Sequence, residues 1–516
     1  ERSDSQYIKW TIWLIAGSFL FRVIYPLLFP VNLAGDEAYY WEWGRRPDIG
    51  YFSKPPLIAW IYTAADFIGS GSLYGIRIFP VLFGTGSMIV TWALARKMFD
   101  ARTGFYATLL VALFPGNSLL NLVLTIDAPL VLFWALSLFF FWKAVKHEGG
   151  FLTYALLFLF IGLGHLSKQM MLFFPALAII YLLTGRETRA QLKKPLMWLA
   201  LIGSLVFLAP PLIWNSQNDW ITFNHMSTHV GAQSEELSTY EMLSDRLGDF
   251  AEFFGSQLGA LTPIFFFIVI VTSFTGQLVR KNFSPKSRFF FVFCGAPFVA
   301  ITIVSMTQKV QANWPAVFYI AGAIAAATWF AEVTDALPLK TKIRQRFLRI
   351  GTVMSIVISC FFYFASPVFK AIGQEGHKLD PNRRLLGSAG LAAAIHEVRQ
   401  TIPEDHFIIC AGHRYNTSRL AFELPDQPLV YRWNGGKYID SQYELWPGPW
   451  AEEREGQTAL IVQPFPGNRV QPGVGSSFEK ITHLGEVKVE AGVGRTKLAN
   501  LFLGENLIKP LGDRPK

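Results

Sequence analysis

Two neighbouring carboxylates open the most chemically dense stretch of the sequence. Asp36 and Glu37 follow Gly35 in LAGDEAYYWEWGRRPDIGYFSKPPLIAW, residues 33–60, immediately after an apolar run. An ionised side chain at a membrane boundary is costly unless it pairs, meets water or binds something. An aspartate there can act as a general base toward an acceptor hydroxyl or a phosphate. The alternative, that both acids only cap an interfacial helix, stays open at this point.

A second carboxylate, Asp127 in LTIDAPLVLFW, stands at the start of another apolar run. Taken alone it is equally well explained as a helix cap, because a proline follows two positions later. Two acids at one site could share base and metal-binding roles, so Asp36 and Asp127 are our candidate catalytic residues. His225 and His229 are four residues apart but lack a third ligand. We therefore predict no metal site and no required cofactor, and leave a divalent metal open.

Isolated basic residues near the ends of apolar runs form a third group. They are Lys54, Arg77, Lys168 and Lys309. A single such residue usually extends its charge to the lipid headgroups. Four on one face would instead suggest a phosphate pocket, in which arginine binds bidentately and lysine acts as a point charge. A phosphate leaving group held by cations does not need a metal.

Aromatic residues surround the first acidic pair, and Tyr40 is the candidate substrate contact among them. The rings are Tyr39, Tyr40, Trp41 and Trp43. Tyrosine and tryptophan form belts at membrane interfaces, and that alternative stays open. The same rings could also stack on a sugar or on an isoprenoid tail.

The composition is that of a membrane protein. Of 516 residues, 52% are hydrophobic and only 16% are charged, against about 25% charged in an ordinary soluble protein. Apolar runs long enough to cross a bilayer recur through the first 370 residues or so, which predicts about 11 to 13 transmembrane helices. We place the runs at residues 10–29, 73–94, 106–124, 129–142, 151–164, 170–183, 196–214, 258–279, 289–306, 314–330 and 350–369. We do not interpret the first run as a signal peptide, because similar runs keep returning.

The net charge of +9 follows the predicted membrane topology. Residues from Gly376 onward carry 17 basic and 16 acidic side chains, so +8 belongs to the hydrophobic part. This excess falls on alternate connections between the runs, which the positive-inside rule assigns to the cytoplasm. The carboxylates, the isolated cations and the tail then share the outer side. A nucleic-acid partner is not predicted, and the membrane lipids are the expected surroundings.

The polar tail is predicted to be a small α/β domain. Residues 406–412, 428–433 and 458–465 have the composition of short strands bounded by turn residues. Residues 389–400 have helical periodicity. The predicted domains are therefore a transmembrane part, residues 1–372, and a soluble part, residues 373–516. Three cysteines, of which only Cys410 is in the tail, allow no disulfide within it.

Several of these motifs together resemble a known family. They are DEAYYWEWG after the first run, KPPL in the same loop, GIRIFP, TIDAPL, LSKQMMLFFP and QKVQANWPAVF. In this order they are similar to bacterial membrane glycosyltransferases of the GT-C fold, related to protein O-mannosyltransferases and to the aminoarabinose and galacturonic acid transferases that modify lipid A. The resemblance covers roughly residues 35–330. QANWPA differs from the histidine- or tyrosine-containing versions of that region.

The resemblance implies a GT-C transmembrane domain with a periplasmic α/β domain in the bacterial inner membrane, and a sugar donor on a polyprenyl phosphate. Asp36 matches the catalytic carboxylate of the first outer loop. The residues that would position acceptor, sugar and lipid phosphate are Glu37, Lys54, Arg77, Asp127, Lys168 and Lys309. The acceptor would be lipid A, lipopolysaccharide or another glycan or lipid.

Two other functions are compatible with a multispan body that contains ionisable residues. One is a transporter or flippase of lipid-linked sugars or polysaccharides, although transport sites usually lie near the bilayer midplane. The other is an O-antigen ligase or polymerase with a diphosphate-linked donor. The chemistry of the donor would distinguish a ligase or polymerase from the glycosyltransferase that the resemblance implies.

Overall fold

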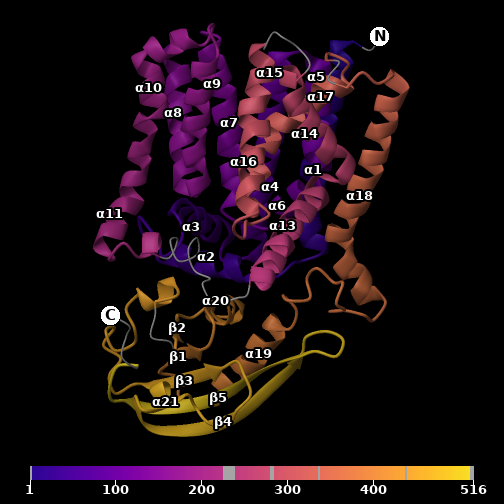
Figure 1. Ribbon diagram of the computed structural model, residues 1–516. Coiled ribbons are helices and arrows are strands. Elements are labelled where there is room, and N and C mark those ends of the chain that lie inside the picture. Colours follow the sequence, from indigo (N-terminus) through magenta and orange to yellow (C-terminus); the bar gives the residue numbers. More distant parts are fainter. Residues whose placement is uncertain (1–2, 225–238, 279–283, 335–336, 436–438, 512–516) are drawn as a thin grey trace. The chain divides into compact units, whose positions relative to one another are not determined.

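The computed structural model describes residues 3–224, 239–278, 284–334, 337–435 and 439–511, and it divides into two compact units (Figure 1). The first unit comprises Glu1–Leu28, Lys54–Ile58 and Tyr74–Phe362. The second comprises Phe29–Ser53, Ala59–Leu73 and Tyr363–Lys516. The second unit therefore combines the predicted soluble tail with two segments from the beginning of the chain. The predicted boundary at residues 372 and 373 separates membrane from soluble sequence and stays a prediction.

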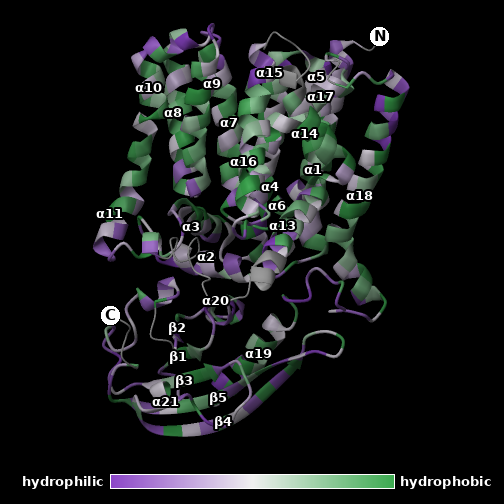
Figure 2. Ribbon diagram, viewed as in Figure 1, coloured by the Kyte–Doolittle hydropathy of each residue, from purple (hydrophilic) through white to green (hydrophobic). Residues whose placement is uncertain are grey.

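The first unit is built from helices that are largely apolar, with hydrophilic residues mostly toward their ends (Figure 2). Its α-helices are α1 (Asp4–Leu28), α4 (Leu73–Met98), α5 (Ala101–Leu113), α6 (Pro115–Leu120), α7 (Asp127–Val145), α8 (Gly150–Ser167), α9 (Phe173–Thr184), α10 (Pro195–Leu201), α11 (Ala209–Gln217), α13 (Thr239–Leu261), α14 (Pro263–Leu278), α15 (Pro285–Phe290), α16 (Ala296–Ser305) and α17 (Tyr319–Phe330). Short 3-10 or π segments are η1 (Gln169–Leu172), η2 (Arg189–Lys193), η3 (Gly203–Leu208), η4 (Phe291–Gly295) and η5 (Trp314–Val317). Helix α18 (Thr341–Ala371) contributes residues to both units.

Seven helices of the described residues are long and apolar enough to cross a membrane. They are Asp4–Leu28, Leu73–Met98, Asp127–Val145, Gly150–Ser167, Pro195–Gln217, Pro285–Ser305 and Thr341–Ala371. The chain is thus a polytopic helical membrane protein, as the sequence predicts. The expected runs at 106–124, 170–183 and 314–330 fall in shorter apolar helices, which is why the sequence-based number of spans is larger.

The run expected at residues 258–279 is broken. Helices α13 and α14 meet at 97° around Thr262 and count as an eighth span only if taken together. Thr262 has a φ of +68°, a left-handed conformation that β-branched residues rarely adopt. Pro263 follows it, and a proline disfavours helical geometry at the preceding residue. The chain therefore turns sharply where the sequence predicts a continuous span.

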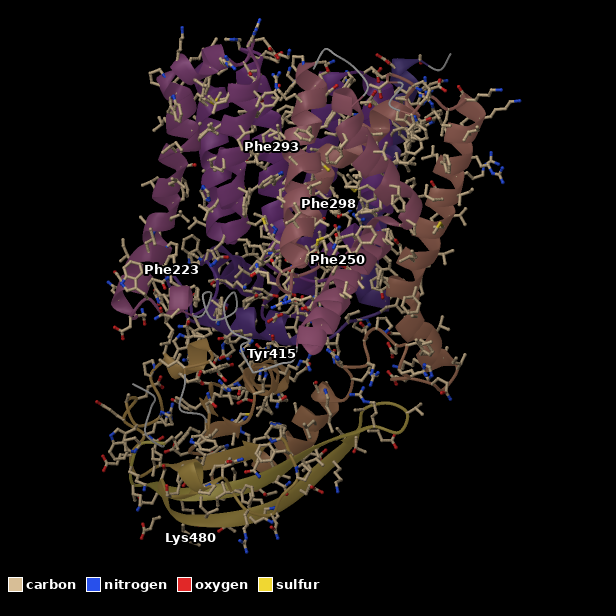
Figure 3. All side chains as sticks on the ribbon, viewed as in Figure 1. Phe223, Phe250, Phe293, Phe298, Tyr415 and Lys480 are labelled. Carbon is tan, nitrogen blue, oxygen red and sulfur yellow. The ribbon has the colours of Figure 1, made fainter. Side chains whose placement is uncertain are left out.

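A cluster of buried rings anchors α7 in the first unit. Trp134 is fully buried and lies edge-on to Phe174 at 5.1 Å and to Phe318 at 5.5 Å between ring centroids. Phe174 in turn packs on Phe293, which Figure 3 shows on the segment of α15, η4 and α16. Between membrane helices such a cluster stabilises by van der Waals packing rather than by removal of the rings from water. Trp134 comes two turns after Asp127, so this packing orients the helix that carries Asp127.

Two short helices from the beginning of the chain pack together in the second unit. Helix α2 (Gly35–Arg45) and α3 (Leu57–Gly69) approach closely at Gly44, where an added Cβ would lie 2.8 Å from Tyr62. The hydroxyl of Thr63 donates to the carbonyl oxygen of Gly44 at 2.7 Å. The indole of Trp41 donates to Asp66 at 2.9 Å. These bonds give α2 a fixed rotation about its own axis.

A five-stranded sheet forms the rest of the second unit. The strands are β1 (His406–Ala411), β2 (Val430–Trp433), β3 (Thr458–Gln463), β4 (Phe478–Glu490) and β5 (Thr496–Leu507), in the order β2-β1-β3-β5-β4. Strands β2, β1 and β3 are parallel, and β5 is antiparallel to both β3 and β4. The helices are α19 (Ser388–Arg399), α20 (Arg414–Glu423), η6 (Gln442–Glu444) and α21 (Pro472–Gly475).

The predicted α/β tail is confirmed, with strands β1, β2 and β3 and helix α19 close to their expected places. Helix α20 makes the crossover between β1 and β2 that two parallel strands require. Its first residues therefore follow the carboxyl end of β1. In open α/β sheets this is the edge at which ligands usually bind.

Candidate functional site

The candidate base Asp36 lies in the first turn of α2 and is exposed. Its Oδ1 accepts a hydrogen bond of 2.7 Å from the phenol of Tyr415, which belongs to α20 and is labelled in Figure 3. A carboxylate in the first helical turn is also stabilised by the positive end of the helix dipole. Asp36 is thus a held but accessible carboxylate. Sequence reasoning missed Tyr415, because no local signal links residues 379 positions apart.

Tyr415 can reach Asp36 because Gly35 has no side chain. A Cβ built on Gly35 would lie 2.5 Å from the Tyr415 ring, which is closer than real Cβ contacts. The ring of Tyr415 therefore packs directly on the backbone at the beginning of α2. At the other end of the contact, His413 caps α20, and its Nδ1 accepts from the backbone N–H of Tyr415 at 3.3 Å. The contact with Gly35 and the cap by His413 together fix the position of the phenol.

A half-buried arginine, Arg414, adds positive charge to this contact. The Cζ atom of Arg414 lies 5.0 Å from the Tyr415 ring centroid and 5.6 Å from that of Tyr39. Burial alone would lower the pKa of Arg414, but Tyr415, Tyr39 and Asp36 outweigh it and raise the pKa. Burial and the charge of Asp36 raise the pKa of Tyr415. The phenol therefore stays a hydrogen-bond donor at neutral pH.

Glu37 has a structural partner. It is fully buried, and its Oε2 accepts from the backbone N–H of Ala34 at 3.0 Å. This is the capping role that the sequence left open for the acidic pair, and it applies to Glu37 rather than to Asp36. Arg419 of α20 interacts electrostatically with Glu37 as well.

The rings of α2 are packing residues of the second unit. Tyr40 is 5% exposed and lies edge-on to Trp43 at 5.1 Å. Tyr39 stacks on Tyr443 at 5.8 Å, and Trp41 lies edge-on to Phe422 at 5.1 Å. These contacts attach α2 to the α/β tail. They explain why so many aromatic residues follow the carboxylate pair.

A second cluster lies in the first unit and is centred on Asp127. Its Oδ1 accepts from Lys168 at 2.7 Å, and its Oδ2 accepts from Asn313 at 2.6 Å. The side chains of Asp127 and Lys168 are only 5% and 11% exposed. Asp127 does not cap α7 through its side chain, since Ile126 holds the cap position. The two oxygens of Asp127 are instead used to join α7, the end of α8 and the loop before η5.

The loop that carries Asn313 is held from α13. The buried amide of Gln257 donates to the carbonyl oxygen of Ala312 at 3.0 Å and accepts from the phenol of Tyr319 at 2.7 Å. Asn313 is a residue that sequence reasoning missed, although it stands inside the QANWPA motif. An asparagine between two hydrophobic helices was the available signal.

The remaining predicted cations have different environments. Lys309 is 60% exposed and forms ion pairs with Glu252 at 3.2 Å and Asp249 at 3.8 Å, both on α13. Hydrogen bonding to Glu252 raises the pKa of Lys309. Arg77 is buried in the first turns of α4, and Lys54 is half-buried in the segment that precedes α3. Lys168 contacts the predicted carboxylate Asp127 in the first unit.

Within the described ranges, no three histidine, cysteine or acidic side chains are grouped as a metal site would require. His225 and His229 lie outside the described residues. The pairing of Asp127 with Lys168 and Asn313 uses both of its oxygens in protein contacts. The donor set at Asp127 is that of an ion pair.

The architecture defines the class of fold, which is GT-C. The chain is similar over 95% of its length to the solved structure of ArnT from Cupriavidus metallidurans bound to undecaprenyl phosphate, with a TM-score of 0.62, 14% identity and 98% of that chain covered. At this identity the likeness establishes the fold, and it includes the tail as well as the helices. The predicted resemblance to GT-C membrane proteins is thereby confirmed.

Two transferases are similar to this chain in sequence. A lipid A galacturonosyltransferase, RgtD, from Rhizobium johnstonii is 27% identical over 61% of this chain, and the match spans 64% of that relative. A lipopolysaccharide core galacturonosyltransferase, RgtA, from the same organism is 25% identical over 82% of both chains. The chain thus matches less than two thirds of the length of RgtD. Its resemblance to transferases that modify lipopolysaccharide is supported by both.

A family model also matches part of the chain. Residues 53–214 fit the model described as dolichyl-phosphate-mannose-protein mannosyltransferase. The matched part contains Lys54, Arg77, Asp127 and Lys168. It begins after the segment that carries Asp36 and Glu37.

Proposed function

We propose that this chain is an inverting membrane glycosyltransferase that moves a sugar from a polyprenyl-phosphate carrier to an envelope acceptor. The observation that carries the proposal is the exposed carboxylate of Asp36, held by Tyr415 at 2.7 Å at the first turn of α2. Its setting in a GT-C fold supports the reading. The reaction would take place at the periplasmic face of a bacterial inner membrane, with the tail on that side.

Asp36 is proposed to be the general base. Tyr415 donates to Oδ1, so Oδ2 is the oxygen that would take the proton of the acceptor hydroxyl. A positioned base of this kind contributes about 10²–10⁴-fold to a rate. The deprotonated acceptor oxygen attacks the anomeric carbon as the bond to the carrier phosphate breaks. One displacement inverts the anomeric configuration.

The leaving group is a lipid phosphate whose negative charge grows as the bond breaks. Lys54, Arg77 and Lys168 are proposed to meet that charge, which cations can do without a metal. Asp127 would hold Lys168 in place through the ion pair of 2.7 Å. Lys309 is the weaker candidate, because two acids of α13 already neutralise it. Glu37 and Tyr40 would act by fixing α2.

The acceptor and the sugar are proposed from the relatives. RgtD is named for lipid A and RgtA for the lipopolysaccharide core, and both are named galacturonosyltransferases. Lipid A or lipopolysaccharide is therefore the first acceptor to test, and galacturonic acid the first sugar. Undecaprenyl phosphate, which the ArnT structure binds, is the first carrier.

The test is transfer by the purified full-length chain in lipid nanodiscs. Labelled galacturonic acid on undecaprenyl phosphate is supplied with lipid A, and in parallel on undecaprenyl diphosphate. Transfer from the monophosphate that a chelator leaves unchanged supports the proposal. Transfer from the diphosphate alone would indicate a ligase or polymerase. Movement of the carrier lipid between leaflets without any transfer would indicate a transporter.

A further inference from the structure

A cavity of about 530 Å³ opens in the second unit beside strand β2. This volume is within the range of roughly 300–1,000 Å³ that is usual for small-molecule sites. Its walls are unusually aromatic and include Tyr431, Trp433, Trp446 and Trp450, together with Arg46 and Glu444. None of these residues belongs to the proposed reaction. The cavity therefore needs a separate explanation.

The indole rings are held in place rather than loosely exposed. Glycines face two sides of Trp433: a Cβ at Gly473 would lie 2.6 Å from the ring, and one at Gly435 would lie 2.9 Å from it. Trp446 is 8% exposed and lies edge-on to Tyr443 at 5.3 Å. A rigid aromatic wall binds at a low cost in side-chain entropy, because its rotamers are already fixed.

The polar groups of the cavity divide into two kinds. Arg432 is almost fully buried and donates to Gly412 at 2.9 Å, to Ser441 at 3.0 Å and to Glu444 at 2.7 Å, and also pairs with Asp440. Its charge is balanced by acidic side chains of the protein, so Arg432 lines the cavity without offering an unpaired charge to a ligand.

Arg46 is different from Arg432. Its guanidinium lies over the ring of Trp446, 4.3 Å from the centroid. The neighbouring Arg45 pairs with Glu42 at 2.8 Å, and Arg46 interacts with the same carboxylate electrostatically. A half-buried cation spread over an indole face can meet an anionic group of a ligand that packs on the same wall.

We infer that this cavity is a saccharide-binding site that takes a pyranose ring with an anionic substituent. One C–H face of the ring would pack on Trp450, and the carboxylate or phosphate would meet Arg46, which itself lies over Trp446. Aromatic side chains bind the apolar face of a partly polar ligand well, because their own surface is large and rigid. Neither the proposed base nor the proposed phosphate-binding cations line the cavity.

The site has a defined relation to Asp36, because both are on α2. Asp36 is in the first turn and Arg46 is the C-cap, so they are about 15 Å apart along the helix axis at 1.5 Å per residue. A ring in the cavity is therefore not the reacting sugar. If the proposed function holds, the site takes a remote sugar of the substrate, whose binding energy can position the reacting group.

The inference is tested by binding alone, with the full-length protein in lipid nanodiscs and no donor present. The probes are methyl galacturonoside and methyl galactoside, which share one ring and differ in the carboxylate. Saturation-transfer NMR is expected to show binding of the acidic glycoside and at least about tenfold weaker binding of the neutral one. Signal no greater than that of empty nanodiscs, or equal binding of both glycosides, would overturn the inference.

Variants assign the signal to the cavity. Trp450→Ala is expected to weaken binding about tenfold and Trp450→Phe much less, because phenylalanine keeps an aromatic face. Arg46→Gln should remove the preference for the acidic glycoside. Lys480→Gln is the matched control, since it removes an exposed charge from β4 at the opposite edge of the sheet (Figure 3). Unchanged binding in Trp450→Ala and Arg46→Gln would place the probe elsewhere and overturn the inference.

The result is independent of the proposed function. A chain that binds the glycoside through these residues but transfers no sugar would contradict the proposed function and leave the site. A chain that transfers sugar but fails to bind the glycoside would support the proposed function and overturn the inferred saccharide site.

Discussion

The phenol of Tyr415 donates a hydrogen bond of 2.7 Å to the carboxylate of Asp36, across 379 positions of the sequence. The bond joins the first helix of the second unit to the α/β tail. Since Gly35 lets the Tyr415 ring pack on the backbone of α2, the contact is built by shape as well as by the hydrogen bond. The tail is thus part of the setting of the candidate base.

Removal of this hydrogen bond should weaken catalysis without abolishing it. Tyr415→Phe keeps the ring packed on Gly35 and deletes only the donor. We expect transfer to fall about tenfold, because a hydrogen bond to a charged group is worth about 1.5–3 kcal/mol and solvent replaces part of it at an exposed carboxylate. The measurement is kcat/KM for sugar transfer. An unchanged kcat/KM in Tyr415→Phe, measured on a variant whose thermal unfolding matches that of the wild type, would contradict this role of Tyr415.

Shape at the same contact is tested by a methyl group. Gly35→Ala places a Cβ 2.5 Å from the Tyr415 ring, so α2 and α20 must separate. We expect overpacking to lower the free energy of unfolding by about 1–3 kcal/mol. Thermal unfolding of the protein in nanodiscs measures this loss. Gly17→Ala is the control: an added Cβ meets nothing within 4 Å in α1. It should be neutral or stabilise by up to about 1 kcal/mol. Equal effects of both changes would contradict the contact.

The pair of Asp127 and Lys168 should be strongly coupled. Lys168→Met leaves the buried carboxylate without its cation, which is expected to cost about 3–5 kcal/mol of stability. The double variant Asp127→Leu with Lys168→Met should recover most of the stability while transfer stays low. Lys309→Met is the surface comparison, and its exposed ion pairs should matter little. If the loss of stability in the double variant equals the sum of the losses in the two single variants, Asp127 and Lys168 are not coupled.

A lysine of the tail gives a pH-dependent prediction. Burial, followed by repulsion from Arg419 and Arg495, lowers the pKa of Lys497 to about 8. Because the folded-state pKa lies below the unfolded value, its stabilising contribution is complete above about pH 10.4 and is lost as the pH falls through about 8.

The thermal unfolding midpoint of the wild type minus that of Lys497→Met should therefore increase between pH 7.5 and 10. Comparison with the variant cancels the titration of all other groups. A constant difference across this range would show that Lys497 has an ordinary pKa.

The sequence predicts the membrane part of the fold well where single long helices dominate. Apolar runs such as residues 10–29 and 129–142 suffice to place α1 and α7, because hydropathy alone decides them. It fails at Thr262, where a left-handed residue before a proline turns an apolar run by 97°. Hydropathy carries no information about such a break.

The tail was predicted in part for a similar reason. Strands β1 and β3 are buried on both faces and form continuous apolar runs. Strand β4 is largely exposed and has an irregularity between His483 and Gly485, so its alternation is interrupted. Helix α20, which carries Tyr415, has a polar sequence without a clear apolar face.

The candidate site was predicted as a set of residue types rather than as contacts. The topology predicted from the sequence assigns Asp36, Asp127 and Lys168 to one side of the membrane, and the order of the motifs indicates the fold. Partners such as Tyr415 and Asn313 depend on packing between distant segments, which no local pattern encodes. The buried position of Glu37 follows from the same long-range packing.

The most direct test of the central claim is a single-turnover measurement with Asp36→Asn. Purified wild type and variant in nanodiscs are mixed with labelled undecaprenyl-phosphate galacturonic acid and lipid A, and donor binding and transfer are followed in the same sample. The account predicts that the variant binds the donor normally and transfers at least about 10²-fold more slowly. Transfer by the variant at the wild-type rate would contradict the assignment of Asp36 as the base.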